Sequence, residues 1–396
     1  MAVRILISGA GIAGPTLAYW LSQYGFTPTI VEIAPRLRTG GYVIDFWGAG
    51  FDVADRMGLL PELRREGYML QEVRVVNRKG ERIARVPAAA FAHASHGRYL
   101  SLPRSDLAAT IFRHLGGNVE TIFGDSIESL RETESGVRVT FSRAEPREFD
   151  LVIGADGLHS RVRELVFGPE SRFERYLGMK AAAFEIEGYR PRDELIYVMY
   201  TEVGRQIARF SMRDDRTLFL LTFRDQSEEL PRDLAARKSY LRERYNGCGW
   251  EWPQIAEALD RTTELYFDRV SQIRMSAAKG LWTRGRVALV GDAAFCVSLL
   301  AGQGSALAMA AACILAGELH RAKSDFATAF KNYEALFGPF VLKKQTSALR
   351  LASSFAPKSQ FSLFIRNQIM NLLQVHWIAD VFASRGLMDN ITLPEY

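Results

Sequence analysis

Six residues near the N-terminus have the composition and spacing of a phosphate-binding turn. The turn is Gly9-Ala10-Gly11-Ile12-Ala13-Gly14. It follows an expected strand at residues 3–8 and opens an expected helix at residues 13–24, whose first N–H groups and dipole attract negative charge. In such a turn Gly9 permits the tight bend, Gly11 admits a pyrophosphate against the backbone, and Gly14 allows helix and strand to pack closely. The sequence therefore predicts a dinucleotide site.

An acidic residue ends the next expected strand, residues 29–32. Glu32 lies about twenty residues after the glycine turn. Dinucleotide-binding folds place a carboxylate at this spacing, where it lies beside the adenosine ribose. A carboxylate there accepts hydrogen bonds from both ribose hydroxyls and disfavours a 2′-phosphate. The tightly held ligand is therefore expected to be FAD or NAD and not NADP.

Two later turns distinguish FAD from NAD. Each follows an apolar strand, expected at residues 149–153 and 287–290. The turns are Gly154-Ala155-Asp156-Gly157 and Gly291-Asp292-Ala293-Ala294, and Gly302-Gln303-Gly304-Ser305 then opens a helix at residues 303–319. Asp292 can accept a hydrogen bond from a ribityl hydroxyl, while Gly302 and Gly304 leave room and free N–H groups for a flavin edge. The order of these motifs favours FAD.

The three motifs in this order resemble those of the class A flavoprotein aromatic hydroxylases, which share the fold of para-hydroxybenzoate hydroxylase. The resemblance spans about the whole chain and is greatest to the tetracycline-inactivating monooxygenases. This closer likeness rests on residues 37–45, 291–296 and 393–396. It implies an α/β fold, with a Rossmann-like FAD-binding domain, an inserted β-sheet substrate domain and a C-terminal helix.

The resemblance also implies roles for five charged side chains. Arg38 would lie beside the flavin or the incoming nicotinamide cofactor, and Asp45 and Arg104 would contact FAD. Asp156 would belong to a motif shared between FAD and NAD(P)H, and Asp292 would hold the ribityl chain. For the two arginines the alternative is a plain surface position. For Asp156 it is a role in holding its own turn.

Three positions depart from the pattern of this family. Phe295 stands where His or Tyr is usual, Leu299 where Pro is usual, and Ala306 where Asn is usual. The family's Pro and Asn flank the flavin ring, so these departures bear on ring placement and oxygen chemistry. They leave the adenosine end unaffected.

Six segments are expected along the chain, three of which together form the FAD-binding domain. Those three are residues 1–70, 101–178 and 277–345. The others are substrate-domain strands at 71–100, the β-sheet substrate domain at 179–276 and a C-terminal helical segment at 346–396.

The substrate domain is expected to hold four antiparallel strands, at residues 181–186, 195–200, 207–212 and 217–223. Period-two alternation turns about half of their aromatic side chains toward a cavity. The candidate wall residues are Phe184, Tyr197, Tyr200, Phe210, Phe219 and Phe223.

Two helices are expected outside the motifs. Residues 105–115 predict a helix with Ser105 as its N-cap. Residues 361–382 carry apolar side chains at helical spacing, which predicts a core helix that clamps two lobes. The alternative for this segment is a helix on a membrane surface, but its polar face has few basic groups.

Composition excludes several classes of protein. The 396 residues are 48% hydrophobic and 24% charged, with a net charge of +5 and scattered basic residues, which argues against a nucleic-acid partner. No apolar run suggests a membrane span or a signal peptide. The 3 cysteines lack metal or redox spacing, and we expect a cytoplasmic protein without a metal.

The expected function is that of an FAD-dependent monooxygenase driven by NADH or NADPH. It would hydroxylate an aromatic, phenolic or polycyclic small molecule, tetracycline-like or polyketide-like, with O2, as a monomer or homodimer. The sequence identifies no catalytic base. The alternative, which Leu299 and Ala306 motivate, is a flavin-bound non-oxygenase of the same fold, such as a cyclase or reductase of secondary metabolism.

Overall fold

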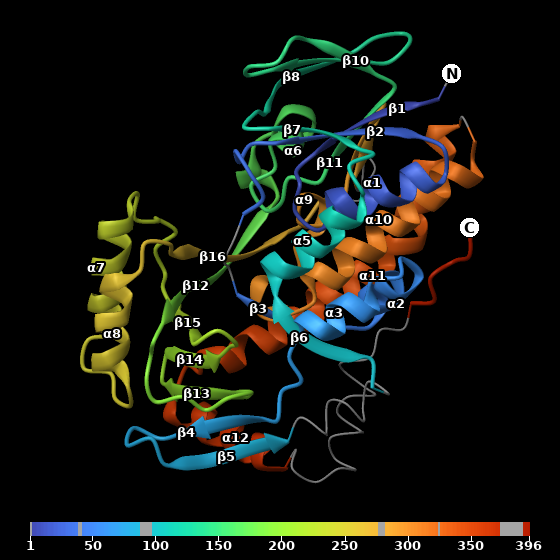
Figure 1. The fold of residues 1–396 in the computed structure, drawn as a ribbon. Coiled ribbons are helices and arrows are strands. Elements are labelled where there is room, and N and C mark those ends of the chain that lie inside the picture. Colours follow the sequence, from blue (N-terminus) through green and yellow to red (C-terminus); the bar gives the residue numbers. More distant parts are fainter. Residues whose placement is uncertain (1, 39–41, 88–96, 276–281, 324, 373–390) are drawn as a thin grey trace.

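Two large β-sheets with flanking helices build the molecule, seen in the computed structural model of Figure 1. The structure describes the chain except for residues 1, 39–41, 88–96, 276–281, 324 and 373–390. The side chains of residues 350–354 are also outside the description.

The first sheet has six strands, five of them parallel. Its order is β17-β18-β11-β1-β2-β7, and only β17 runs antiparallel to its neighbour. The strands are β1 (Arg4–Ser8), β2 (Thr27–Glu32), β7 (Glu120–Phe123), β11 (Leu151–Gly154), β17 (Thr283–Arg284) and β18 (Val287–Leu289). The carboxyl ends of parallel strands meet at one edge of a sheet, where open α/β folds bind ligands. The three motifs follow β1, β11 and β18 and therefore meet at this edge.

Helices cover this sheet and are centred on one buried helix. The helices are α1 (Ala13–Gln23), α2 (Ala49–Arg56), α3 (Leu60–Glu66), α5 (Arg104–His114), α6 (Arg161–Phe167), α9 (Asp292–Phe295), α10 (Gly304–Arg321) and α11 (Phe326–Phe355). Helix α10 packs between α1, α2 and α11, and its residues 306–319 are all buried. A helix that is apolar on every side is stable only when neighbours cover it all round.

The second sheet has seven strands, in the order β16-β12-β15-β14-β13-β4-β5. Its strands are β4 (Glu72–Val76), β5 (Arg82–Pro87), β12 (Glu174–Glu187), β13 (Ile196–Glu202), β14 (Arg205–Ser211), β15 (Arg216–Arg224) and β16 (Tyr266–Ile273). All neighbours pair antiparallel except β13 and β4. Helices α7 (Leu234–Arg244) and α8 (Trp252–Arg261) lie along one face of this sheet, at the left of Figure 1, over an apolar cluster of their own.

Smaller elements complete the fold. Strands β3 (Val43–Trp47) and β6 (Tyr99–Pro103) pair with each other, and β8 (Ile127–Glu132), β9 (Val137–Phe141) and β10 (Arg147–Phe149) form a three-stranded sheet. The 3₁₀ turns η1 (Glu170–Arg172) and η3 (Leu299–Ala301) are also present, and Leu299 of η3 lines the large cavity described below.

The expected α/β fold class is confirmed, while two local predictions are corrected. The helix predicted from Ser105 begins at Arg104 with Pro103 as N-cap, because proline at φ −57° has no N–H to leave unsatisfied. The single strand predicted at residues 149–153 is two strands, β10 and β11, separated at Asp150. There the Asp150 carboxylate accepts the N–H of Arg4 at 2.6 Å. The domain boundaries given above stay predictions.

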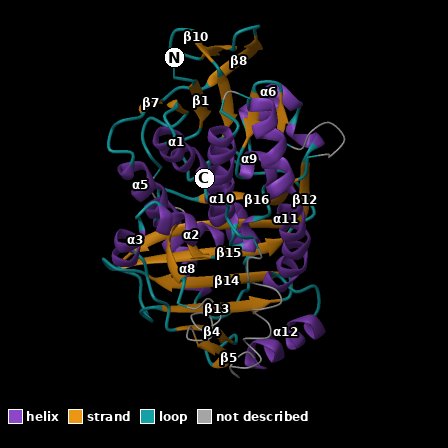
Figure 2. Ribbon diagram, turned by 90° about the vertical axis from the view of Figure 1, so that its right-hand side faces the viewer, coloured by secondary structure: helices purple, strands orange, loops and turns teal. Residues whose placement is uncertain are grey.

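The prediction of a C-terminal core helix is wrong for the residues that the structure describes. Helix α12 (Gln360–Leu372) lies beside β5 at the edge of the second sheet (Figure 2), and none of its residues is buried. Most of its apolar side chains face solvent, with Phe361 74% and Phe364 57% exposed, while Met370 packs against an apolar cluster of the second sheet. Apolar periodicity identified a helix with an apolar face but not what covers that face. Residues 373–382 of the predicted helix lie outside the described residues.

Candidate cofactor and substrate site

A cavity of about 1220 Å³ begins at the carboxyl edge of the six-stranded sheet and extends to β12 and β16 of the second sheet. A smaller hollow of about 60 Å³ adjoins it. Both are lined by Gly11, Tyr42, Arg104, Asp292, Cys296 and Leu299, among others. Pockets for drug-sized ligands have volumes of about 300–1,000 Å³. The larger cavity is therefore roomy enough for a dinucleotide with a small molecule beside it.

Most of the residues predicted for the cofactor site lie around these two spaces. The larger is lined by Gly9, Gly11, Glu32, Arg38, Arg104, Asp156 and Asp292. The smaller is lined by Gly11, Ile12, Ala13, Arg104, Asp292, Gly302, Gly304 and Ser305. Gly14 and Asp45 line neither.

The three glycines of the first turn are needed for different reasons. Gly9 has φ +106°, and a Cβ there would stand 2.5 Å from the carbonyl oxygen of Ala155. A Cβ on Gly14 would stand 1.9 Å from the carbonyl oxygen of Gly9. The protein's own packing therefore requires both. At Gly11, the nearest atom to an added Cβ is the Arg104 guanidinium at 3.7 Å, so the missing side chain leaves a cradle open to the cavity.

Two helix N-termini without side-chain caps face the same region. Helix α1 begins after Ile12 and α10 begins after Gln303, and neither N-cap side chain accepts a hydrogen bond from its helix. The first N–H groups of a helix need partners from outside it, and phosphate is a suitable one. The open cradle and these N-termini fit the phosphates of FAD.

Glu32 lies where the ribose is expected. Its carboxylate accepts the N–H of Ala10 at 2.8 Å and the N–H of Ala34 at 3.0 Å. These bonds fix the carboxylate at the end of β2 and join it to the glycine turn. An ionised carboxylate has about four acceptor sites, so two hydroxyls can still donate to it.

Asp292 and Arg104 form the charged centre shared by both spaces. Asp292 begins α9, and Gly304 is so close that a Cβ there would stand 3.7 Å from Asp292 Oδ1. Burial raises the pKa of Asp292, and the positive charge of Arg104 opposes that shift. Arg104 lies at the start of α5, and its backbone N–H donates a hydrogen bond to the carbonyl oxygen of Tyr42 at 3.1 Å. Side chains from two distant segments thus meet here.

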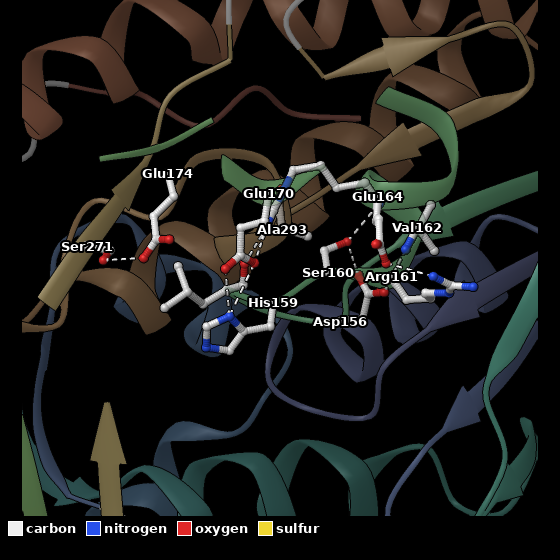
Figure 3. A network of polar contacts seen from close by, with 12 residues as sticks. Asp156, His159, Ser160, Arg161, Val162, Glu164, Glu170, Glu174, Ser271 and Ala293 are labelled. Carbon is white, nitrogen blue, oxygen red and sulfur yellow. Dashed lines mark hydrogen bonds and ion pairs between the residues drawn. The ribbon is translucent and has the colours of Figure 1, made fainter. Parts of the chain in front are cut away.

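The contacts of Asp156 favour its role in holding the turn. Its carboxylate accepts hydrogen bonds from Ser160 Oγ at 2.5 Å and from the N–H of Val162 at 3.1 Å (Figure 3). It also accepts one from Ser8 Oγ at 3.3 Å. Ser160 in turn caps α6 by accepting the N–H of Arg163. Burial raises the pKa of Asp156, and these hydrogen bonds oppose the shift. A contact between Asp156 and NAD(P)H stays a prediction.

Asp45 and Arg38 are both exposed. Asp45 lies on β3, where it accepts the hydroxyls of Tyr99 at 2.6 Å and Ser101 at 2.7 Å. These two residues belong to the neighbouring strand β6, so Asp45 links the β3–β6 pair. Its expected contact with FAD stays a prediction. Arg38 lines the large cavity from the segment after β2.

The three departures from the family pattern have separate physical settings. The ring of Phe295 packs in the core, with its centroid 4.9 Å from that of Trp282. Leu299 lines both spaces from η3 and follows Ser298, whose φ of 120° is strained for a residue other than glycine. Ala306 is buried where α10 packs against α2. A Cβ added to Gly50 would stand 2.6 Å from the Cβ of Ala306. The larger asparagine has no room there unless α2 moves.

Sequence reasoning missed the aromatic residues that face this cavity. Of the six aromatic wall candidates, only Phe184 is among the residues that line it, and all six rings pack into apolar clusters of the second sheet. The cavity is lined instead by Tyr42 and Tyr266, whose ring centroids lie 5.8 Å apart. Alternation locates the two faces of a strand, but it does not say which face meets the cavity. The sequence did offer one signal for Tyr42, because it lies within residues 37–45, one of the segments on which the closer resemblance rests.

Fold and site together define a two-domain flavoprotein of the aromatic-hydroxylase type. The family model described as "FAD binding domain" matches residues 2–328. A flavin-dependent monooxygenase from an unknown prokaryotic organism is 35% identical over 360 residues, which cover 89% of this chain and 90% of that protein. The chain belongs to this family of FAD-dependent monooxygenases, and the predicted family and cofactor are confirmed.

Solved structures agree with this assignment. The tetracycline destructase Tet(51) is 31% identical, with a TM-score of 0.84 and all of both chains covered. Klebsiella pneumoniae HpxO in complex with FAD and uric acid has a TM-score of 0.81 at 22% identity, covering 98% of this chain and 97% of that one. This second likeness shows the fold alone.

Two kinds of feature are absent from the described residues. No helix among them is long and apolar enough to cross a bilayer. No group of three or more histidine, cysteine or acidic side chains among them is arranged to hold a metal ion.

Proposed function

We propose that this monooxygenase hydroxylates an aromatic, phenolic or polycyclic small molecule with O2, using NADH or NADPH as a transient reductant. One observation carries the proposal: one cavity joins the glycine turn to strands β12 and β16 of the second sheet. Cofactor and substrate can therefore meet in one space. When bound, FAD supplies the chemistry, accepting reducing equivalents from the nicotinamide and activating oxygen.

The chain's own groups would hold FAD along the first half of the cavity. The N–H groups at the starts of α1 and α10 would bind its phosphates and flavin edge, and Glu32 its ribose. Asp292 would accept a ribityl hydroxyl, with Arg104 beside it. Arg38, at the rim, would face the flavin or the incoming nicotinamide.

Tyr42 and Tyr266 would orient the substrate. Both side chains line the cavity, and their hydroxyls have no hydrogen-bond partner among the described residues. Burial raises the pKa of Tyr42 to about 12 and that of Tyr266 well above its ordinary value, so both stay protonated at neutral pH. They therefore act as hydrogen-bond donors to a phenolic or enolic oxygen and not as bases. Phe184, Leu265 and Leu299 supply apolar surface that excludes water.

A tetracycline-like or polyketide-like substrate is supported by the similarity to tetracycline destructase Tet(51). A cytoplasmic location fits the three free, buried cysteines Cys248, Cys296 and Cys313. A monomer or homodimer is expected, with no nucleic-acid partner.

The second candidate is a flavin-bound protein that inserts no oxygen, such as a cyclase or reductase. Leu299, the strained Ser298 before it and the crowded Ala306 favour it, because all three bear on where the flavin ring sits.

The test uses purified protein carrying FAD. We expect a flavin absorbance spectrum, and we expect a phenol or a tetracycline from a panel to accelerate both NAD(P)H oxidation and oxygen uptake. Oxidation that stays at background with the whole panel would favour the second candidate. A protein that binds no FAD would overturn both.

A further inference from the structure

His159 stands where the two halves of the large cavity meet. It lies between β11 and α6 and lines the cavity with a half-exposed ring. Its Nδ1 is 3.0 Å and 3.2 Å from the two carboxylate oxygens of Glu170, as Figure 3 shows. Its Nε2 is 3.1 Å from Oδ2 of Asp268, which belongs to β16 of the second sheet. The ring thus connects the FAD-binding half to the substrate half.

This geometry fixes the charge of the ring. A neutral imidazole carries one N–H, so in either tautomer the other nitrogen would direct its lone pair at a carboxylate. Only the imidazolium ion donates to both partners. In agreement, the two carboxylates raise the pKa of His159 to about 10. Both ring nitrogens are donors at neutral pH, and no lone pair is left to accept a substrate proton.

Other charges around the ring support this arrangement. Glu170 also accepts Arg163 Nη2 at 2.8 Å, and Arg269 of β16 lies 3.5 Å from it. Arg269 is 3.0 Å from Glu174, at the start of β12. Burial of Arg163 disfavours its charge and the acidic neighbours oppose that shift in pKa. Cations and carboxylates alternate across the junction of the two domains.

The same chain of contacts reaches the ribityl-binding turn. Arg163 is fully buried, and its Nη1 donates to the carbonyl oxygen of Ala293 at 3.0 Å, one residue after Asp292. Charged hydrogen bonds therefore run from that turn through Arg163, Glu170 and His159 to Asp268. Both Asp268 and His159 face the cavity.

We propose that His159 is a positioning residue that ties the FAD-binding wall of the cavity to the substrate-sheet wall, and that it is not the catalytic base. This proposal rests on the monooxygenase function given above. Removing the imidazolium takes away the group that bonds to both Glu170 and Asp268, although Glu170 keeps its contact with Arg163, and the two walls move apart. Water then enters a space that must stay dry for efficient oxygen transfer.

The first experiment is kinetic. We expect His159→Gln to bind FAD as the wild type does but to yield severalfold less hydroxylated product per NAD(P)H, with hydrogen peroxide making up the difference. The pH profile of the remaining hydroxylation should keep its acidic limb, because no base has been removed. Asp268→Asn in the His159→Gln background should restore some of the coupling, because it removes an unpaired charge. His114→Gln is the matched control, because His114 is not among the residues that line the cavity.

Unchanged coupling in His159→Gln would overturn the proposal, as would loss of the acidic limb of its pH profile, because that limb is the one that a general base produces. An NMR titration of the His159 ring in the wild-type holoenzyme needs no turnover. A ring that is still protonated at pH 8 supports the proposed link between the two walls, and a ring that titrates near pH 6.5 overturns it. A wild type that consumes NAD(P)H without hydroxylating any substrate would instead refute the proposed function, while the NMR result would still decide on that link.

Discussion

The two ends of the cavity are built in different ways. At the adenosine end, the glycine turn and Glu32 face the space, and both lie within residues 9–32. At the substrate end, side chains from four distant segments face it, namely Tyr42, His159, Tyr266 and Leu299. The first end is encoded locally and can be recognised by spacing alone. The second exists only once the two sheets have come together.

The largest expected effect tests the local end. Gly11→Val should abolish FAD binding, because its side chain would fill the cradle expected for the pyrophosphate. The fold should survive, since the nearest protein atom to an added Cβ is 3.7 Å away. Flavin absorbance and circular dichroism measure the two effects.

Gly14→Val is the contrasting variant. Its Cβ would stand 1.9 Å from the carbonyl oxygen of Gly9, so we expect loss of the fold together with FAD. If Gly11→Val kept a full complement of FAD, the cradle would have been assigned wrongly.

The second prediction lies between the two ends. Asp292→Ala should weaken FAD binding by about ten- to a hundredfold, since a hydrogen bond to a charged group contributes roughly 1.5–3 kcal/mol. The quenching of flavin fluorescence on binding gives the dissociation constant. Asp292→Asn, which keeps the size and one acceptor oxygen, should fall between wild type and alanine. Equal affinities in all three proteins would show that Asp292 does not touch the cofactor.

The third prediction tests whether packing explains Ala306, which stands where the family usually has asparagine. Ala306→Asn should lower the free energy of unfolding by roughly 1–3 kcal/mol, the usual range for overpacking a core. The added atoms would press on Gly50 of α2. Ala306→Ser adds one atom and should cost less. Urea denaturation measures both. Full stability in Ala306→Asn would mean that the alanine is not forced by packing.

The contrast between the two ends also explains what the sequence could predict. Strand β1, helix α1 and strand β2 follow the expected segments closely because short-range spacing determines them. Helix α12 was expected in the core and lies at the surface, because periodicity does not identify a partner. Tyr266 and His159 lie in segments that resemble the family, but spacing predicted no role for either. The roles proposed for them depend on contacts between residues more than a hundred positions apart.

The smallest effect concerns pH. The pKa of His159 rises from an ordinary 6.5 to about 10 in the folded protein. Its contribution to stability is therefore fully present below pH 6.5 and is lost as the pH rises through about 10. The difference in free energy of unfolding between wild type and His159→Gln should shrink over this range, and it stays small because the ring is half exposed. A difference that grew with pH would contradict the imidazolium assignment.

The central claim is that FAD and substrate meet in one cavity, where an oxygen atom passes to the substrate. Mass spectrometry of the product formed under isotopically labelled O2 tests it most directly. The account predicts a product that gains one labelled oxygen atom per turnover. A product formed at the same rate without the label would contradict the account and leave the flavin-bound non-oxygenase in its place.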